Sequence, residues 1–398
     1  MRRCCDLSLT GAALLAPALL AGCRASDDAR GRTVTTDTAA SGAIVVTNGE
    51  RGIWDDASTW RLVEELRIAS PDGTGPAAFN QVMALEVDAT GRVYAAESRP
   101  PEIRVFTADG AYLRTIGRQG GGPGEFQEVA AMLWDSTGRL LVVDQRNARY
   151  ARFDTTGRFE GSVPRIVSAF SMFPWPGRIL DDGRMVDVGM KPGSTAFEHI
   201  LIAARPGSPG RDTIALPSYD AQVFSHQSGT SRVQAAVPFA PSLIWVLDSR
   251  GYLWSAVTDR YRIVQRRLAG DTVRIIERAF QPVTVTASER DTAVARLVWF
   301  RRQGGQVDAA RIPGVKPAFT SLMLDDRGYL WTTPSRSEGA EQTTYDVFDP
   351  DGRYLGPVVG SCGPWRPLIR GDRLYGVCYD EDGVPAVVRY RIANRPAL

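Results

Sequence analysis

Hydrophobic and polar positions repeat with a fixed offset in the first half of the chain. Leu66–Gly110 aligns with Leu113–Gly157 without a gap, an offset of 47 residues. In each copy a Gly-x-Gly-Pro segment is followed by a phenylalanine, which is Phe79 in the first copy and Phe126 in the second. Two copies with one pattern indicate that this stretch is a structural repeat.

Each repeat contains short apolar strands separated by turns. The segment "LEVDATGRVYAA" places an Asp-x-x-Gly turn between two strands, which is typical of a tight hairpin. A third strand follows and ends in a second turn, as in "IRVFTADG" and "YARFDTTG". Weaker copies are "DDGRMVDV", "DSRGYLWSA", "DDRGYLWTT" and "GDRLYGVCY". Six four-stranded antiparallel units predict an all-β fold, a six-bladed β-propeller.

The first and last repeats are incomplete in a complementary way. By the offset, Glu65–Ser70 matches the outermost strand of a blade, but no strands before it complete that blade. The last blade, near Leu374–Ile392, lacks its outer strand. Because an open array would expose two sheet edges, we expect the N-terminal strand to join the C-terminal blade and close the ring.

The repeat motifs resemble those of NHL-repeat and related six-bladed propellers. The second blade carries the junction "GPGEF", the turn residues Asp135 and Gly138, then Asp144, Asn147, Arg149 and Phe153. The first blade has Glu97 in place of the second aspartate, and the later blades depart further. The resemblance implies the propeller architecture for most of Leu66–Ile392.

The glycine-rich stretch "GRQGGGPGEF", Gly117–Phe126, raises the question of a phosphate site. Pro123 stands where a phosphate-binding P-loop requires lysine, and the dinucleotide pattern Gly-x-Gly-x-x-Gly is absent. The first copy, "SPDGTGPAAF", has no cation between its glycines. The pattern therefore favours a junction between blades, with Phe79 and Phe126 filling the seam.

Two long gaps between turns predict insertions, near residues 191–241 and 284–317. The first contains both histidines, His199 and His226, which are too few for a histidine-based metal site. The second contains "SERDTAVARLVWFRRQ", Ser288–Gln303, with apolar residues on one helical face and a capping box from Ser288 to Asp291. We expect one inserted helix that covers a blade edge or seam; a lid over the channel or a membrane contact are the alternatives.

The N-terminus predicts export and lipid anchoring. Arg2 and Arg3 precede an apolar stretch that is too short to remain as a membrane span. It ends in Leu20-Ala21-Gly22-Cys23, which resembles the bacterial lipoprotein signal and implies lipidation of Cys23. Residues 1–22 are thus the expected signal peptide, 23–50 a flexible tether, and 51–398 the propeller. Arg24 after the cysteine favours the outer membrane, facing the periplasm or the cell surface.

The cysteine count and the charge balance are consistent with an exported protein. Cys362 and Cys378 remain as a pair in an oxidising compartment, and we expect a disulfide between them, with two separate thiols as the alternative. The formal net charge is +2, which gives no general attraction to nucleic acid.

Candidate ligand-binding residues come from positions that follow equivalent strands. Propeller ligands bind at one mouth of the channel, in loops held by a rigid ring. Glu97 and Asp144 end equivalent strands and are the acidic candidates. The arginines that follow such strands, which could bind a carboxylate or phosphate or else form ordinary surface ion pairs, are Arg99, Arg146, Arg149, Arg260 and Arg336. We expect the aromatic pairs Tyr252/Trp254 and Tyr329/Trp331 to lie in the core, with a sugar-stacking surface as the alternative.

The repeats leave no catalytic constellation unexplained, since there is no Gly-x-Ser-x-Gly elbow and no Cys/His cluster. The sequence thus favours a lipid-anchored extracytoplasmic binding or scaffolding protein, a monomer without catalytic residues, cofactor or metal, whose partner is a protein, glycan or peptide. The resemblance leaves open a calcium-dependent hydrolase or lactonase, or a lyase, with its site in the channel. Glu97 and Asp144 could then provide oxygen ligands for calcium, whereas the histidine ligands of a lyase are missing at matching positions.

Overall fold

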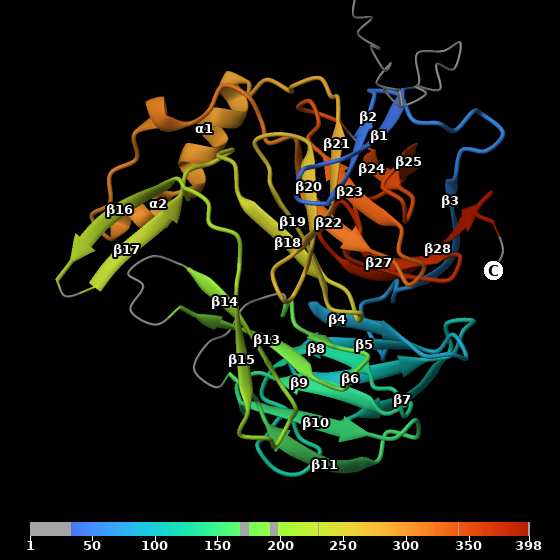
Figure 1. Ribbon diagram of the computed structural model, residues 1–398. Coiled ribbons are helices and arrows are strands. Elements are labelled where there is room, and N and C mark those ends of the chain that lie inside the picture. The colour runs from blue at the N-terminus through green and yellow to red at the C-terminus, as the bar shows by residue number, and fades with distance from the viewer. Residues whose placement is uncertain (1–32, 168–174, 192–197, 230, 341, 397–398) are drawn as a thin grey trace, which may run out of the picture.

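The computed structural model describes residues 33–167, 175–191, 198–229, 231–340 and 342–396. The strands form six blades, each an antiparallel four-stranded sheet, arranged in a ring (Figure 1). From the inner to the outer edge, blade 1 consists of β4 (Val82–Val87), β5 (Val93–Ser98), β6 (Pro101–Phe106) and β7 (Tyr112–Ile116). Blade 2 consists of β8 (Val129–Trp134), β9 (Leu140–Asp144), β10 (Arg149–Phe153) and β11 (Phe159–Pro164). Blade 3 consists of β12 (Arg178–Ile179), β13 (Met185–Met190), β14 (His199–Ala204) and β15 (Arg211–Ala215). Blade 4 consists of β18 (Leu243–Leu247), β19 (Tyr252–Val257), β20 (Arg262–Arg267) and β21 (Thr272–Arg278). Blade 5 consists of β22 (Phe319–Leu324), β23 (Leu330–Pro334), β24 (Thr343–Phe348) and β25 (Tyr354–Gly360). Blade 6 consists of β26 (Trp365–Arg370), β27 (Arg373–Tyr379), β28 (Pro385–Ala393) and β3 (Arg61–Ile68).

The sixth blade takes its outer strand from the N-terminal part of the chain. Strand β3 pairs antiparallel with β28, with Ile68 opposite Val387 and Leu66 opposite Arg389 (Figure 1). The Glu65 carboxylate also lies 3.1–3.4 Å from the guanidinium groups of Arg373, Arg389 and Arg391 in the same blade. The N-terminal strand thus occupies the place that the repeat offset predicts.

Apolar packing between neighbouring blades completes the ring. Each of the six blade interfaces has its own cluster of buried side chains. The cluster between the last and the first blade joins Tyr375 and Val387 to Val93 and Phe106. Because every blade packs against two neighbours, no blade face is left open to water.

In blades 1, 2, 4 and 5 an Asp-x-x-Gly turn joins the first and second strands. In blade 1 the Asp88 carboxylate accepts hydrogen bonds from the backbone N–H groups of Thr90 and Arg92, at 2.9 and 3.0 Å. Gly91 has φ +82°, a conformation that favours glycine. All of these turns lie on one end of the ring, here named the turn face, because successive antiparallel strands run in opposite directions.

The glycine-rich stretch is a junction between blades, as predicted. Phe126 is fully buried between blades 1 and 2, and Phe79 fills the seam between blades 6 and 1. The ring of Phe126 lies so close to Gly117 that a Cβ there would come within 2.2 Å of it. The glycine is therefore needed for packing of the phenylalanine.

The prediction of a flexible tether over residues 23–50 is wrong for its second half. Strands β1 (Val34–Thr38) and β2 (Ile44–Asn48) form a hairpin, and β2 pairs in parallel with β21 at the edge of blade 4. The Asn48 side chain donates to Glu277 O and Gly352 O, both at 3.0 Å, and accepts from Tyr354 N at 2.7 Å. Backbone and side-chain hydrogen bonds thus order a segment that has few large apolar groups.

The first predicted insertion is shorter than expected. Of residues 191–241, His199–Ala215 are the third and fourth strands of blade 3, so His199 lies in β14. The true insertion carries the hairpin of β16 (Val223–Ser228) and β17 (Ser231–Ala236), with His226 in β16. The turn between β14 and β15 does not follow the Asp-x-x-Gly pattern, so the sequence repeat did not reveal these strands.

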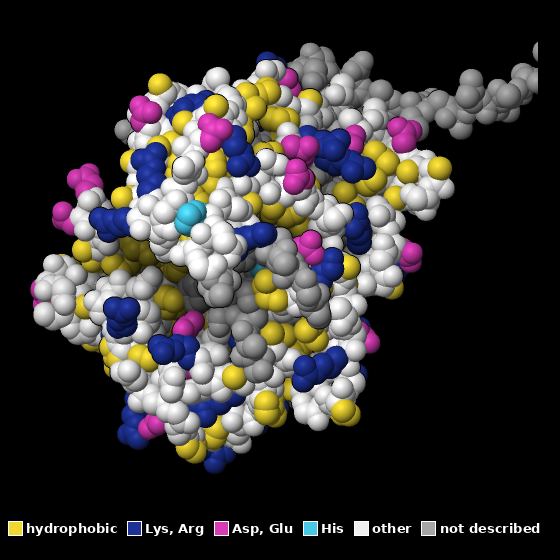
Figure 2. All heavy atoms as spheres, turned by 90° about the vertical axis from the view of Figure 1, so that its left-hand side faces the viewer, with side chains coloured by type: hydrophobic (Ala, Val, Ile, Leu, Met, Phe, Trp, Pro, Cys, Tyr) yellow, Lys and Arg dark blue, Asp and Glu magenta, His cyan; other side chains and the backbone are white. Residues whose placement is uncertain are grey.

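The second insertion contains two short helices rather than one long one. They are α1 (Ala287–Arg296) and α2 (Val298–Arg302), followed by a 3-10 turn, Ala309–Arg311, and the capping box uses Thr286 and Glu289 instead of Ser288 and Asp291. Leu297 and Phe300 pack on Phe224 of the hairpin, so the two insertions cover each other. On the face that carries them, basic and acidic side chains are interspersed (Figure 2). Among the described helices, none is long and apolar enough to cross a bilayer.

Cys362 and Cys378 form the predicted disulfide within blade 6. Their sequence separation is 16 residues. A loop of this length implies a stabilisation of about 3 kcal/mol. The expected signal peptide, residues 1–22, and Cys23 lie outside the described residues.

Replacing both cysteines by alanine will lower the free energy of unfolding by about 2–4 kcal/mol, because the unfolded chain regains the entropy of the closed loop. Urea unfolding of the double variant and the parent, both without reductant, measures the change. Adding reductant to the parent should reproduce the loss, and an unchanged midpoint in both comparisons would contradict it.

Candidate functional site

The predicted acidic candidates lie on the face opposite to the turn face, at the ends of the second strands. Asp144 is fully buried and accepts hydrogen bonds from the backbone N–H groups of Gln127 and Glu128, at 3.1 and 3.2 Å. Its other oxygen accepts from Asn147 Nδ2 at 2.6 Å and Arg149 Nε at 3.2 Å. Glu97, the equivalent residue in blade 1, is also buried and accepts from Asn80 N at 3.1 Å.

Arg149 points into its own blade junction. Its guanidinium donates to the carbonyls of Gly121, Gly122 and Glu125 at 2.6–3.1 Å. The motif residues Asp144, Asn147 and Arg149 therefore hold the glycine-rich junction in place. Their arrangement is structural and leaves no free guanidinium donor face for a ligand at Arg149.

The remaining predicted arginines have separate surroundings. Arg99 and Arg146 are exposed. Arg260 lies 3.7 Å from its neighbour Asp259, and Arg336 donates to the carbonyl of Gln342. These contacts describe separate loops rather than one binding ring.

The aromatic pairs are divided between core and surface. Trp254 and Trp331 are buried in the blade interfaces, as expected. Tyr252 is half-buried between the guanidinium groups of Arg250 and Arg267, each within 5.7 Å of its ring centroid.

The geometry of Glu97 and Asp144 does not fit a calcium site. Calcium requires six to eight oxygen ligands, yet in the described part of the chain no three His, Cys, Asp or Glu side chains group as metal ligands. Both oxygens of Asp144 already accept hydrogen bonds, and only Oε1 of Glu97 is buried without a partner.

An Asp144→Ala substitution will cost about 2–4 kcal/mol of stability, because buried donors of Arg149 and Asn147 lose their acceptor. The exposed neighbour provides a matched control: Arg146→Ala should change the free energy of unfolding by less than about 0.5 kcal/mol. Chemical denaturation of both variants measures the difference. Equal stability of the two variants would show that Asp144 is not a structural residue.

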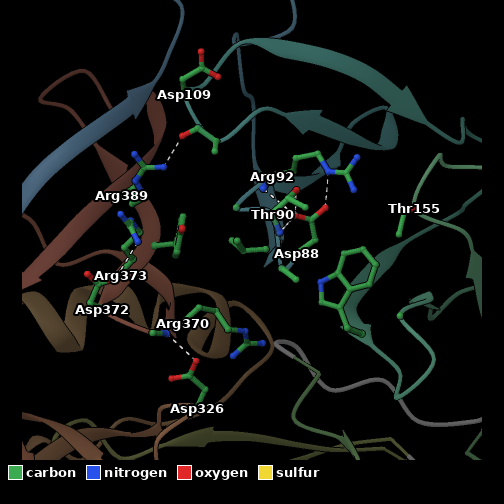
Figure 3. Close-up of a pocket in the computed structure, with 18 residues that line it drawn as sticks. Asp88, Thr90, Arg92, Asp109, Thr155, Asp326, Arg370, Asp372, Arg373 and Arg389 are labelled. Atoms are coloured by element: carbon green, nitrogen blue, oxygen red, sulfur yellow. Dashed lines mark hydrogen bonds and ion pairs between the residues drawn. The ribbon is translucent and has the colours of Figure 1, made fainter. Parts of the chain in front are cut away.

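The turn face carries a large hollow, here named the groove. Its volume is about 1050 Å³, and it runs from the turns of blades 1 and 2 to those of blades 5 and 6. One side of the groove is lined by arginines of blade 6, namely Arg370, Arg373 and Arg389 (Figure 3). Asp88 and Arg92 of blade 1 line the side that faces them.

Most charged groups of the groove are paired. Arg92 Nε donates to Asp88 Oδ2 at 2.6 Å, and Arg373 Nη1 donates to Asp372 Oδ1 at 2.9 Å (Figure 3). Partial burial opposes ionisation of Asp88, but the hydrogen bonds from Thr90 and Arg92 hold its pKa below the ordinary value. The groove is therefore a preorganised polar surface at neutral pH.

A second cavity, here named the channel cavity, lies next to the groove, between the innermost strands of the ring. It has a volume of about 570 Å³ and is lined by the innermost strands of several blades. Trp134 and Arg370 line both the groove and the channel cavity, so the two spaces adjoin.

The charged residues that line the channel cavity are Glu86 of β4, Arg178 of β12 and Arg370 of β26, together with Asp135 and Asp181 of the turns that follow innermost strands. Arg370 Nη2 donates to both carboxylate oxygens of Glu86, at 3.0 and 3.3 Å. Burial raises the pKa of Glu86, although the charge of Arg370 opposes this shift. The groove and the channel cavity together are the candidate functional site.

Sequence reasoning placed its candidates on the opposite face and did not single out Glu86, Arg178 and Arg370. Each is a charged residue near the end of an apolar innermost strand, as in "VMALEV" and "PLIR". A charge at equivalent strand positions of several repeats was the signal that could have identified them.

Comparison with known proteins supports the architecture. A family model described as a 6-bladed beta-propeller matches residues 79–173, less than half of the chain. The chain is a six-bladed β-propeller. No curated protein matches this propeller in sequence.

Two solved structures share the fold. A member of the duf4221 family from Bacteroides vulgatus has a TM-score of 0.53 at 11% identity, covering 85% of this chain and 100% of that one. A candidate exported protein from Bacteroides fragilis has a TM-score of 0.50 at 11% identity, covering 87% and 99%. At such identity these likenesses show the fold of the propeller alone.

Proposed function

We propose that this propeller is a non-catalytic binding protein of the cell envelope, which holds its ligand in the groove and channel cavity of the turn face. The observation that carries this proposal is the pair of adjoining cavities, whose lining combines paired charges with Trp134 on strands and turns of the blades. Concave sites with a few oriented polar groups are typical ligand sites. The partner is a protein, glycan or peptide, or a small molecule.

The side chains that line the groove and the channel cavity are the reason that we propose a binding protein without catalysis. Neither histidine lines the groove or the channel cavity; His199 is in β14 and His226 in β16. Of the acidic residues of the groove, Asp88 and Asp372 are in ion pairs with Arg92 and Arg373, and Asp109 and Asp326 accept hydrogen bonds from Thr107 and Gly371. Among the described residues that line the hollow, no nucleophile lies beside a histidine base.

Metal analysis of the purified protein tests this choice against a calcium-dependent hydrolase, lactonase or lyase. The proposal predicts substoichiometric calcium and an unfolding temperature that a chelator leaves unchanged. A stoichiometric calcium ion that is lost in Glu97→Ala or Asp144→Ala would overturn it in favour of the enzyme.

Location in the cell envelope is part of the same proposal. The Cys362–Cys378 disulfide is typical of proteins in an oxidising compartment. Lipidation of Cys23 would then anchor the propeller at the outer membrane, on the periplasmic or outer surface.

Replacing Cys23 by alanine will move the protein from the membrane fraction to the soluble envelope fraction, because the lipid anchor is lost. Cell fractionation measures the shift, and Cys362→Ala serves as the cysteine control that should stay with the membrane. Membrane retention of the Cys23→Ala variant would contradict lipid anchoring.

A further inference from the structure

Helix α2 presents apolar and basic side chains to solvent. Leu297, at its start, and Phe300 are buried in the cluster that joins α2 to the hairpin of β16 and β17. Because successive residues of an α-helix are rotated by about 100°, Val298, Trp299 and Arg302 lie on the side opposite to this cluster. Val298 is 48% exposed and Trp299 is 43% exposed.

The composition of this segment differs from the rest of the surface. All nine tryptophans of the chain are among the described residues, and only Trp299 is exposed, whereas the others are buried or half-buried. Residues 292–307 contain three arginines, all exposed, and no acidic residue. We name this surface the α2 patch, and its residues are Arg296, Val298, Trp299, Arg301 and Arg302.

The insertion that contains α2 leaves the ring next to the start of the N-terminal hairpin. Val34 pairs with Asn48, and Asn48 pairs with Arg278, the last residue of β21. Because β21 is the fourth strand of its blade, it ends at the face opposite to the turn face, and the insertion follows it directly. The first residue of β1 and the insertion are thus at the same end of the ring, in the upper part of the view (Figure 1).

A lipid on Cys23 would hold this end of the ring close to a bilayer. Cys23 precedes Val34 by 11 residues. An extended chain of this length reaches at most about 40 Å. The groove lies at the turn face, which is the other end of the ring, so a membrane contact through the insertion would leave the groove accessible.

We propose that the α2 patch rests on the surface of a bilayer that contains anionic lipids, and that this contact orients the anchored propeller with its groove directed away from the membrane. The inference rests on the proposed lipidation of Cys23. Tryptophan prefers the headgroup region of a bilayer, where its ring is buried and its N–H stays hydrated. Arginines match lipid phosphates in charge and in geometry. A contact of this size is reversible, so the Cys23→Ala variant is still expected in the soluble fraction.

Fluorescence quenching by brominated lipids tests the contact. The lipidated protein is reconstituted on vesicles of phosphatidylethanolamine and phosphatidylglycerol whose acyl chains carry bromine near the headgroups. We expect quenching of the parent emission, and loss of at least about half of this quenching in Trp299→Phe, because the fold shields the other tryptophans. Vesicles of phosphatidylcholine alone should quench the parent at least about twofold less.

Charge variants separate attraction to lipid phosphates from a change in net charge. Arg301→Gln combined with Arg302→Gln should lower the quenching on the phosphatidylglycerol vesicles at least about twofold, because two positive charges leave the patch. The matched control is Arg158→Gln combined with Arg250→Gln, which removes the same charge from turn-face arginines whose side chains are 78% and 59% exposed. The control should be quenched like the parent.

Mass spectrometry of the purified protein distinguishes the two ways in which the test can fail. If Cys23 carries no lipid, the proposed anchoring fails and the inference fails with it. If Cys23 is lipidated but the parent is quenched no more than Trp299→Phe, or no more than Arg301→Gln combined with Arg302→Gln, the inference is wrong and the anchoring stands. A dimer in detergent that Trp299→Ala dissociates would assign the patch to a second copy of the chain and would overturn the inference too.

Discussion

Replacing Asp187 by alanine will lower the free energy of unfolding by about 3–5 kcal/mol, the largest effect of a single substitution that we expect. Asp187 lies in β13 and is fully buried against blade 2. Its carboxylate accepts from Arg165 at 2.7–3.1 Å, from Trp175 Nε1 at 2.7 Å and from the Tyr150 hydroxyl at 2.8 Å. Alanine would leave these donors unsatisfied and the Arg165 charge buried.

The control is an aspartate–arginine pair at the surface of the same blade. The Asp212 side chain is 68% exposed and lies 3.0 Å from Arg184 Nη1. Asp212→Ala should cost no more than about 1 kcal/mol. Urea unfolding of both variants measures the contrast, and a loss below 1 kcal/mol for Asp187→Ala would show that the buried network is not needed for stability.

Removing the N-terminal strand will abolish cooperative folding. A chain that starts at Ser70 lacks β3, including the buried Ile68, and lacks Trp60, which packs in the core between blades 5 and 6. Loss of a buried tryptophan or isoleucine costs about 2–5 kcal/mol each, and native domains are stable by only about 5–15 kcal/mol. The edge of β28 would also be free to pair with another chain.

A chain that starts at Gly52 separates closure from the general effect of shortening. It lacks β1 and β2 but keeps β3. We expect this chain to stay monomeric with a lower unfolding temperature, and the Ser70 chain to aggregate or unfold without a sharp transition. Size-exclusion chromatography and thermal unfolding measure both. A monomeric, cooperatively folded Ser70 chain would contradict the role of β3 in closing the ring.

The fold could be predicted from the sequence because local chemistry repeats wherever the architecture repeats. Turns such as Asp88–Gly91 require an aspartate acceptor and a glycine with positive φ, so they leave the same residue types in blades 1, 2, 4 and 5. Phe79 and Phe126 repeat because each fills an equivalent seam. These constraints are local, and an alignment of the chain with itself reveals them.

Elements held by backbone pairing left no such signal. The hairpin of β1 and β2 adds to the edge of β21 through main-chain hydrogen bonds, which any sequence can form. Its composition of small and polar residues therefore looked like a tether. The two strands at the end of blade 3 were missed for a similar reason, since their connecting turn lacks the repeated aspartate.

The candidate site was harder to predict than the fold because its residues are far apart in the sequence. Glu86, Arg178 and Arg370 belong to blades 1, 3 and 6 and meet only when the ring is closed. The predicted candidates Asp144 and Arg149 were conspicuous because they belong to the repeat motif, and motif residues hold the junction. The proposed site instead consists of residues outside the repeat motif.

The most direct test of the central claim, that ligands bind at the turn face, compares tryptophan substitutions on the two faces of the ring. Ligand-observed NMR with a fragment library is recorded for the parent, for Ala89→Trp in the groove and for Arg146→Trp at the exposed loop of the opposite face. We predict that fragments bound by the parent are lost with Ala89→Trp and kept with Arg146→Trp. Loss with Arg146→Trp and retention with Ala89→Trp would contradict the claim.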